Sequence, residues 1–182
     1  MDTLAAITQW DFSLLDALQG CRTPFFDKFF SLITHLGDHG LFWIALALVL
    51  LCIPRTRRLG LCVAIALLLD LLLVNIIIKP LVDRPRPYEL QPFELLISAP
   101  RESSFPSGHA AAAFAAVTAL TLNRSKLAIP MGILAAIISF SRLYLYVHYP
   151  TDVFAGILTG ILCGLLAWLL CRWILSKKHI FK

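Results

Sequence analysis

Charged residues are scarce in this sequence, since Asp, Glu, Lys and Arg together make up 15% of its 182 residues. Its five cysteines show no CxxC spacing, and most lie in or beside apolar runs, where cysteine acts as a small hydrophobic residue. This pattern argues against a disulfide framework and against a cysteine metal site. The N-terminus carries acids and no basic segment, so we expect no cleavable signal peptide. Internal repeats and low-complexity linkers are also missing.

Apolar side chains are what the sequence has in excess. They make up 59% of the residues, and the mean hydropathy is +0.80, well above that of a soluble globular chain. The pI of about 9.1 would suit a nucleic-acid-binding protein. We reject that class because the basic residues lie at the ends of apolar runs, as is typical of membrane helices. The composition therefore predicts a membrane protein and no nucleic-acid partner.

The spacing of the apolar runs predicts an all-α, multi-pass transmembrane helical bundle. We expect five clear spans, at residues 40–53, 59–78, 107–122, 127–147 and 150–175. A sixth span is left open. Residues 2–19 have the pattern of an amphipathic helix, which either lies in the membrane interface or packs on the bundle. Residues 24–36 are too short to span easily and are interpreted as interfacial or re-entrant. The chain is thus divided into interfacial helices (1–36) and a bundle (37–182).

The basic residues predict the orientation of this bundle. Nine of the 16 Lys and Arg residues lie in the turn at 55–58, the turn at 124–126 and the tail from Arg172. All three segments fall on one face, which is therefore cytoplasmic, together with the C-terminus. The other seven fall on the extracytoplasmic face, where the orientation rule disfavours them. The one long polar connection, residues 83–106, lies on that outer face, and a loop of this length is often functional.

Two short polar clusters lie between the second and third spans, on the predicted outer face. Lys79 and Arg86 flank a proline-rich helix exit, which could simply place snorkelling cations at a helix end. Ser107, Gly108 and His109 open an apolar helix, with Ser107 placed as its N-cap. A helix N-terminus of this kind is suited to binding an anion such as phosphate. Taken alone, it could also be a capped helix with an incidental histidine.

The third cluster lies around the end of the fourth span. Arg142 is set in an apolar helix, which costs about 2.5–3.5 kcal/mol unless the charge is paired or faces a wet cavity. Pro150 is expected at the first position of the last helix, so that Asp152 can turn back toward His148. A carboxylate on one imidazole nitrogen leaves the other nitrogen free to act as nucleophile or base.

The helix directions bring all three clusters to the same outer level of one bundle. Cations for a phosphate, two imidazoles and an orienting carboxylate are the groups that phosphoryl transfer without a metal requires. The residues alone do not decide which histidine attacks, although the carboxylate four residues from His148 favours that one.

The motifs Lys79-x6-Arg86-Pro87, Pro106-Ser107-Gly108-His109 and Ser141-Arg142-x5-His148-x3-Asp152 resemble the three signatures of the type 2 phosphatidic acid phosphatase (PAP2) superfamily. The resemblance implies that His148 attacks phosphorus to form a phosphohistidine and that Asp152 orients it. It implies that His109 protonates the leaving oxygen and then activates water. The phosphoryl oxygens would be held by Lys79, Arg86, Ser107, Gly108 and Arg142. No metal and no cofactor is implied.

The expected substrate is a membrane lipid phosphate or diphosphate. By the resemblance, undecaprenyl diphosphate is the first candidate, followed by phosphatidylglycerophosphate, phosphatidic acid and a lipid A phosphate. Two other classes stay open, namely a protein that binds or moves anionic lipid without catalysis, and a metal-dependent hydrolase with His109, His148 and Asp152 as ligands. The oligomeric state is left open.

Polar residues outside the motifs receive structural interpretations. Asp70 and Asn75 are expected to make a buried helix–helix hydrogen bond. His35 and His39 are interpreted as interfacial polar residues and Glu102 as part of a solvated loop face.

Overall fold

The computed structural model describes residues 3–177, and within that range the chain is built from helices and turns. The α-helices are α1 (Thr3–Gln19), α2 (Pro24–Thr34), α3 (Leu41–Cys52), α4 (Arg57–Asp70), α5 (Lys79–Val82), α6 (Pro87–Leu90), α7 (Gly108–Leu122), α8 (Ala128–Tyr144) and α9 (Pro150–Lys177). A 3₁₀ segment, η1 (His35–Gly40), joins α2 to α3, and a π-helical segment, η2 (Leu71–Ile78), joins α4 to α5. The prediction of an all-α fold with several apolar helices is confirmed for this part of the chain.

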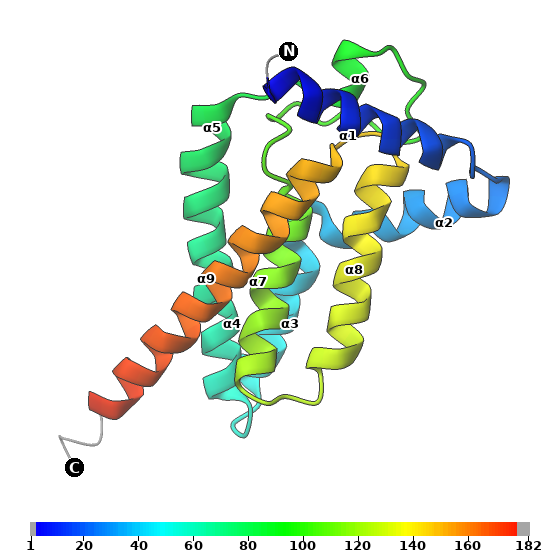
Figure 1. Cartoon of the computed structure of the whole chain (residues 1–182). Coiled ribbons are helices and arrows are strands. Elements are labelled where there is room, and N and C mark those ends of the chain that lie inside the picture. Colours follow the sequence, from blue (N-terminus) through cyan, green and yellow to red (C-terminus); the bar gives the residue numbers. More distant parts are fainter. Residues whose placement is uncertain (1–2, 178–182) are drawn as a thin grey trace.

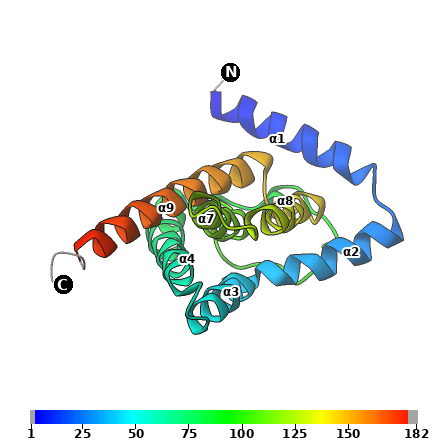
Figure 2. The same cartoon turned by 90° about the horizontal axis from the view of Figure 1, so that it is seen from below.

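The centre of the bundle is α7, which Figure 2 shows among α3, α4, α8 and α9. Seven of its 15 residues are alanines, and all seven are buried. A helix that is apolar on every side belongs in the interior, and small side chains let its neighbours approach closely. Because α7 starts with Gly108 and His109, its central place also brings these two residues to the middle of one end of the bundle.

Helices α7 and α9 cross at very short range because α9 turns three glycines toward α7. A Cβ atom on Gly156 would lie 2.5 Å from the Ser107 carbonyl oxygen, and one on Gly160 would lie 2.3 Å from that of Ala111. Real Cβ atoms do not approach backbone oxygens this closely. The spacing of four residues, continued by Gly164, is the small-residue pattern of tightly packed membrane helices.

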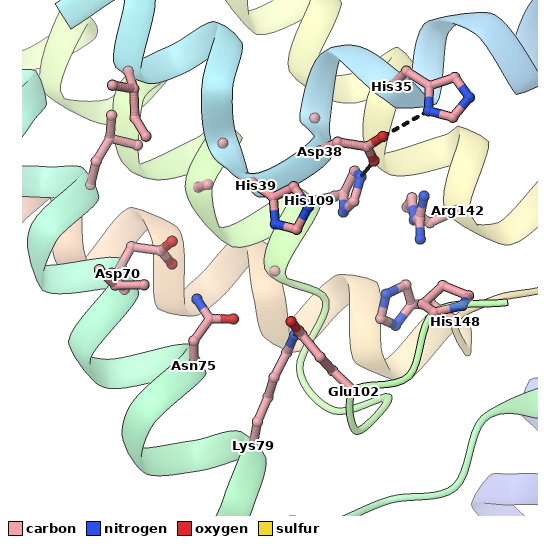
Figure 3. Close-up of a pocket in the computed structure, with 18 of the residues that line it drawn as sticks. His35, Asp38, His39, Asp70, Asn75, Lys79, Glu102, His109, Arg142 and His148 are labelled. Atoms are coloured by element: carbon pink, nitrogen blue, oxygen red, sulfur yellow. Dashed lines mark hydrogen bonds and ion pairs between the residues drawn. The ribbon is translucent and has the colours of Figure 1, made fainter. Parts of the chain in front are cut away.

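The helix that begins with α4 continues to Val82 through η2 and α5, and not only to residue 78 as predicted. Pro80 therefore lies inside the helix, near the start of α5. Proline has no N–H and crowds the preceding turn, and a widened π turn next to it accommodates both defects. The widened turn also sets the direction of Asn75 and Lys79, which both point into a cavity described below (Figure 3).

Within residues 3–177, three helical stretches are long and apolar enough to cross a membrane by length and composition: Pro24–Cys52, Arg57–Leu90 and Pro150–Ile174. Two shorter apolar helices are Gly108–Leu122 and Ala128–Tyr144. The first stretch starts at Pro24 because α2, η1 and α3 follow one another directly. The count of five spans stays a prediction.

The first two helices lie across the bundle (Figure 1). Thr23 caps the N-terminus of α2, since the Phe26 N–H donates to Thr23 Oγ1 over 3.3 Å. Helix α2 packs on α8 through Phe30, whose ring centroid lies 4.6 Å from that of Tyr144. The interfacial position of these helices and the boundary at residue 36 stay predictions.

The predicted cytoplasmic segments gather at one end of the molecule. In Figure 1 the α3–α4 turn, the α7–α8 turn and the C-terminal end of α9 lie opposite α1 and α6. Lys178 and Lys182, which also belong to the predicted basic tail, lie outside the described residues.

Candidate active site

A cavity of about 850 Å³ lies at the end of the bundle where α7 and α9 begin, and it contains most of the predicted site (Figure 3). The predicted residues that line it are Lys79, Arg86, Gly108, His109, Arg142 and His148. Asp152 and Ser107 are fully buried behind this lining. Three segments far apart in the sequence thus contribute to one cavity.

His148 lies at the wall of the cavity with only 2% of its side chain exposed. Its Nε2 is 3.3 Å from Arg86 Nη1, and its Nδ1 is 3.6 Å from Asp152 Oδ2. The second distance is longer than a hydrogen bond, so the carboxylate lies beside Nδ1 without bonding it. Burial, together with the nearby Arg86 and Arg142 charges, lowers the pKa of His148 from 6.5 to about 3. The imidazole is therefore neutral near pH 7, as a nucleophile requires.

The Asp152 carboxylate is held by several donors that the sequence analysis missed. Arg84 Nη1 donates to Oδ1 over 2.6 Å, while Ser104 Oγ and the Tyr149 N–H (2.9 Å) donate to Oδ2. Arg84 is itself fixed by Asp11 and stacks 3.8 Å from the centroid of the Tyr149 ring. Removing a donor from a buried carboxylate is costly, so this network fixes the orientation of Asp152. The sequence did contain a signal for the role of Arg84, because this residue is a cation on the predicted extracytoplasmic face, where the orientation rule disfavours Lys and Arg.

The backbone before His148 adopts an unusual conformation. Tyr146 has a φ of 60°, in the left-handed region that a bulky residue rarely occupies. This residue reverses the chain between α8 and α9. Its hydroxyl bonds Asp16 (3.1 Å) and Gln91 (3.0 Å), and its ring stacks on Phe93. These contacts offset a conformational cost of about 1–2 kcal/mol and direct His148 toward the cavity.

Three cations face the cavity from different elements. Arg86 is anchored through Nη1 to the Val147 carbonyl (2.7 Å) and through Nε to the Glu102 carbonyl (2.7 Å). Arg142 is 2% exposed, and its Nη1 donates to Thr34 Oγ1 over 2.7 Å. Lys79, 8% exposed, is the third. Positive charges this deep require an anionic ligand or acidic neighbours, and a phosphoryl group satisfies the first condition.

Ser107 occupies the predicted N-cap position of α7, but its side chain makes no capping bond. Its Oγ is buried and has no hydrogen-bond partner among the described residues. The Ser107 N–H donates to the Asp152 carbonyl over 3.0 Å, which ties the start of α7 to the start of α9. The Oγ and the first N–H groups of α7 are thus donors available to an anion.

His109 has a carboxylate partner of its own. Its Nε2 lies 3.1 Å from Asp38 Oδ1, and Asp38 Oδ2 lies 2.7 Å from His35 Nδ1 (Figure 3). The sequence analysis interpreted His35 and His39 as interfacial polar residues and gave Asp38, which lies between them, no role. A short polar segment between two apolar runs, flanked by Gly37 and Gly40, was the available signal.

One further expectation was wrong. Asp70 makes no helix–helix hydrogen bond: its Oδ1 is unpartnered within residues 3–177, and the residue lines the cavity beside Asn75. Below these two residues the cavity is bounded by apolar side chains of α3 and α4, among them Leu48, Leu51 and Leu67. Glu102 is 63% exposed, which agrees with a solvated loop face, and its carboxylate in addition binds the Lys79 ammonium.

Known proteins with similar sequences decide the family. A family model described as the PAP2 superfamily matches residues 55–175. The chain belongs to the PAP2 superfamily. The resemblance seen in the three motifs is thereby confirmed, and all three lie inside the matched range.

Relatives in the PAP2 superfamily are named as phosphatases of polyprenyl-linked substrates. An undecaprenyl-diphosphatase of Sulfolobus acidocaldarius is 35% identical over 120 residues, which are 65% of this chain and 58% of that protein. A decaprenylphosphoryl-5-phosphoribose phosphatase of Mycobacterium tuberculosis is 37% identical over 130 residues, covering 70% and 71% of the two chains. The crystal structure of Aquifex aeolicus LpxE superposes with a TM-score of 0.74 at 33% identity, covering 86% of this chain and 93% of that one.

Glu102 binds Lys79, one of the cations predicted to hold phosphate, so we expect its carboxylate to compete with phosphate for that cation. Glu102→Gln is expected to tighten inhibition by inorganic phosphate up to about fivefold, equivalent to about 1 kcal/mol for a half-exposed ion pair. The hydrogen bond from Lys79 lowers the pKa of Glu102, so the carboxylate stays ionised in weak acid. The gain should therefore be the same at pH 5.5 and pH 8. An unchanged or weaker phosphate inhibition constant would contradict this.

Because His148 is buried, we expect the folded protein to lose stability in acid. The unfolded chain takes up a proton on this side chain below about pH 6.5, but the folded PAP2 bundle does so only near its pKa of about 3. Stability is therefore lost as pH falls through this window, at up to ~1.4 kcal/mol per pH unit. The thermal midpoint in detergent should fall more for the wild type than for His148→Gln between pH 7 and 5. Parallel losses in the two proteins would refute the assignment.

Proposed function

We propose that this protein is a metal-independent lipid phosphate hydrolase that passes the phosphoryl group through His148. One observation carries the proposal, namely the placement of His148 at a cation-lined cavity, with the Asp152 carboxylate 3.6 Å from its Nδ1. Nucleophile, orienting carboxylate and phosphate-binding cations are the minimum set for covalent phosphoryl transfer.

In the first step, His148 Nε2 attacks phosphorus, and the bond from phosphorus to the leaving oxygen breaks. His109 gives a proton to that oxygen, and Asp152 balances the positive charge that develops on His148. Lys79, Arg86 and Arg142 hold the non-bridging oxygens, together with Ser107 Oγ and the Gly108 N–H. These donors are already oriented, so they stabilise the transition state without reorganisation.

In the second step, water attacks the phosphorus of the phosphohistidine. His109, now neutral, takes a proton from this water, and the phosphorus–nitrogen bond breaks. Inorganic phosphate leaves and both histidines return to their starting states. The same imidazole serves as acid and then as base, as the reversal of proton flow between the two steps requires.

Undecaprenyl diphosphate is the substrate that we propose first. Support comes from the two polyprenyl-linked relatives and from the apolar lower part of the cavity between α3 and α4, which suits a hydrocarbon chain. We place the site on the extracytoplasmic side, supported by the basic turns at the opposite end of the bundle.

Phosphate release in detergent tests this proposal. Undecaprenyl diphosphate, phosphatidylglycerophosphate, phosphatidic acid and a lipid A phosphate are compared at equal surface concentration, with and without EDTA. We expect EDTA-resistant release that is fastest for the diphosphate. We also expect the rate in right-side-out vesicles given substrate from outside to equal the rate in detergent. Within residues 3–177, no group of three or more His, Cys, Asp or Glu side chains is placed to hold a metal ion. Lipid binding without release would favour the non-catalytic alternative, and loss of release in EDTA would favour the metal-dependent one.

A further inference from the structure

We propose that Asp38 is the positioning residue for His109, so that the proposed enzyme contains two carboxylate–imidazole pairs and not one. The inference rests on the proposed phosphoryl transfer. Asp152 supports the attacking imidazole, and Asp38 supports the imidazole that moves the proton. Asp38 lies 71 residues before His109, outside the three motifs and outside the region matched by the family model.

The contacts of Asp38 point to this role. Its Oδ1 lies 3.1 Å from His109 Nε2, and its Oδ2 is held by His35 Nδ1 at 2.7 Å. Both carboxylate oxygens are therefore engaged, and the carboxylate cannot rotate without losing one imidazole. His109 is 16% exposed at its side chain, so little water competes for its ring. A fixed acceptor at Nε2 determines which nitrogen carries the proton and leaves Nδ1 to face the leaving oxygen.

The backbone before Asp38 is shaped to receive the His109 ring. A Cβ atom on Gly37 would lie 2.4 Å from His109 Cδ2, so the ring packs directly on the glycine backbone. His39, the next residue after Asp38, has a φ of 51°, which turns the chain sharply into α3. The left-handed turn and the bare glycine together bring the carboxylate to the level of the ring. A solvated interfacial segment would have no need of either feature.

The chemistry of the leaving group makes the role measurable. An alkoxide leaving from a phosphomonoester needs a proton, whereas a phosphate leaving from a diphosphate is stable as an anion near neutral pH. A poorly positioned His109 should therefore slow the first step for a monoester much more than for a diphosphate. The second step, in which water must lose a proton, is common to both substrates and should slow for both.

The experiment compares Asp38→Ala and Asp38→Asn with the wild type, on phosphatidic acid and on undecaprenyl diphosphate. For Asp38→Ala we expect kcat/KM on the monoester to fall about 10–100-fold, a part of what general acid catalysis contributes. On the diphosphate it should fall less than about threefold on the same scale. Asn keeps an acceptor for Nε2 and should lose less than Ala. In the His109→Gln background, Asp38→Ala should add nearly nothing, because the two act as a unit.

The matched control is Asp27→Asn, which makes the same chemical change at an ion pair with Arg22 (3.0 Å) outside the cavity. It should leave the ratio of the two kcat/KM values unchanged. An equal loss on both substrates in Asp38→Ala would show a merely structural role and would overturn the inference, as would full additivity with His109→Gln. If the wild type releases phosphate from neither substrate, the proposed function itself has failed, and the inference with it.

Discussion

His148→Gln is expected to reduce phosphate release by about 10⁴-fold or more, the scale seen when an enzymatic nucleophile is removed. Glutamine fills a similar volume and can still accept from Arg86, but its amide cannot form a stable bond to phosphorus. The cations and the N-terminus of α7 remain, so lipid phosphate should still bind. Turnover and inhibitor affinity are measured in parallel, and we expect the first to be lost while the second changes little.

His179→Gln provides a matched change in the predicted basic tail, and its turnover should equal that of the wild type. Loss of proton transfer alone would already slow turnover by about 10²-fold or more. A purified and folded His148→Gln protein that turns over at about one tenth of the wild-type rate or faster would therefore show that another group attacks. His109→Gln should be impaired by about 10²–10⁴-fold, less than His148→Gln.

Gly160→Val is expected to produce the largest loss of stability. The new Cβ would lie 2.3 Å from the Ala111 carbonyl oxygen and 3.0 Å from the Ala115 nitrogen. These are backbone atoms of a central helix, so they cannot rotate away, and α9 must move off α7. We expect a cost of about 3 kcal/mol or more, at the upper end of overpacking effects. Turnover should also fall, because the two helices carry His109 and Asp152 at their starts.

Gly132→Ala is the matched control for this substitution. Its added Cβ would lie 3.7 Å from Val117 Cγ1, an ordinary contact, at a partly buried position of α8. Alanine is the better helix former by about 1 kcal/mol, so the thermal midpoint should stay equal or rise. Equal thermal midpoints for Gly160→Val and the wild type would mean that the close crossing of α7 and α9 is not what holds the bundle together.

The parts of this site that can be predicted from sequence are those encoded at short range. Asp152 lies in the first turn of α9, which begins at Pro150, and His148 comes only two residues before that helix, so the short separation keeps the two side chains close. The apolar runs likewise predict the helices. The π turn next to Pro80 was missed, since a proline in an apolar run is normally interpreted as a helix end.

The supporting residues could not be found in this way. Asp38 and Arg84 act over separations of 71 and 68 residues, on His109 and Asp152 respectively, and no periodicity connects such pairs. Glu102 lies in a polar loop whose course depends on the Arg86 anchors. Their roles follow only from how α1, η1 and the long outer loop pack over the start of α7 and α9.

The central claim is that phosphate is transiently bonded to His148, and trapping that intermediate tests it most directly. His109→Gln slows the second step, so undecaprenyl diphosphate should leave this variant with an acid-labile, base-stable phosphate. Rapid quenching at high pH followed by peptide mass spectrometry should locate one phosphate on His148 and none in the His109→Gln, His148→Gln double variant. A phosphate found on another residue, or turnover by the wild type with no phosphoenzyme in either protein, would contradict the account.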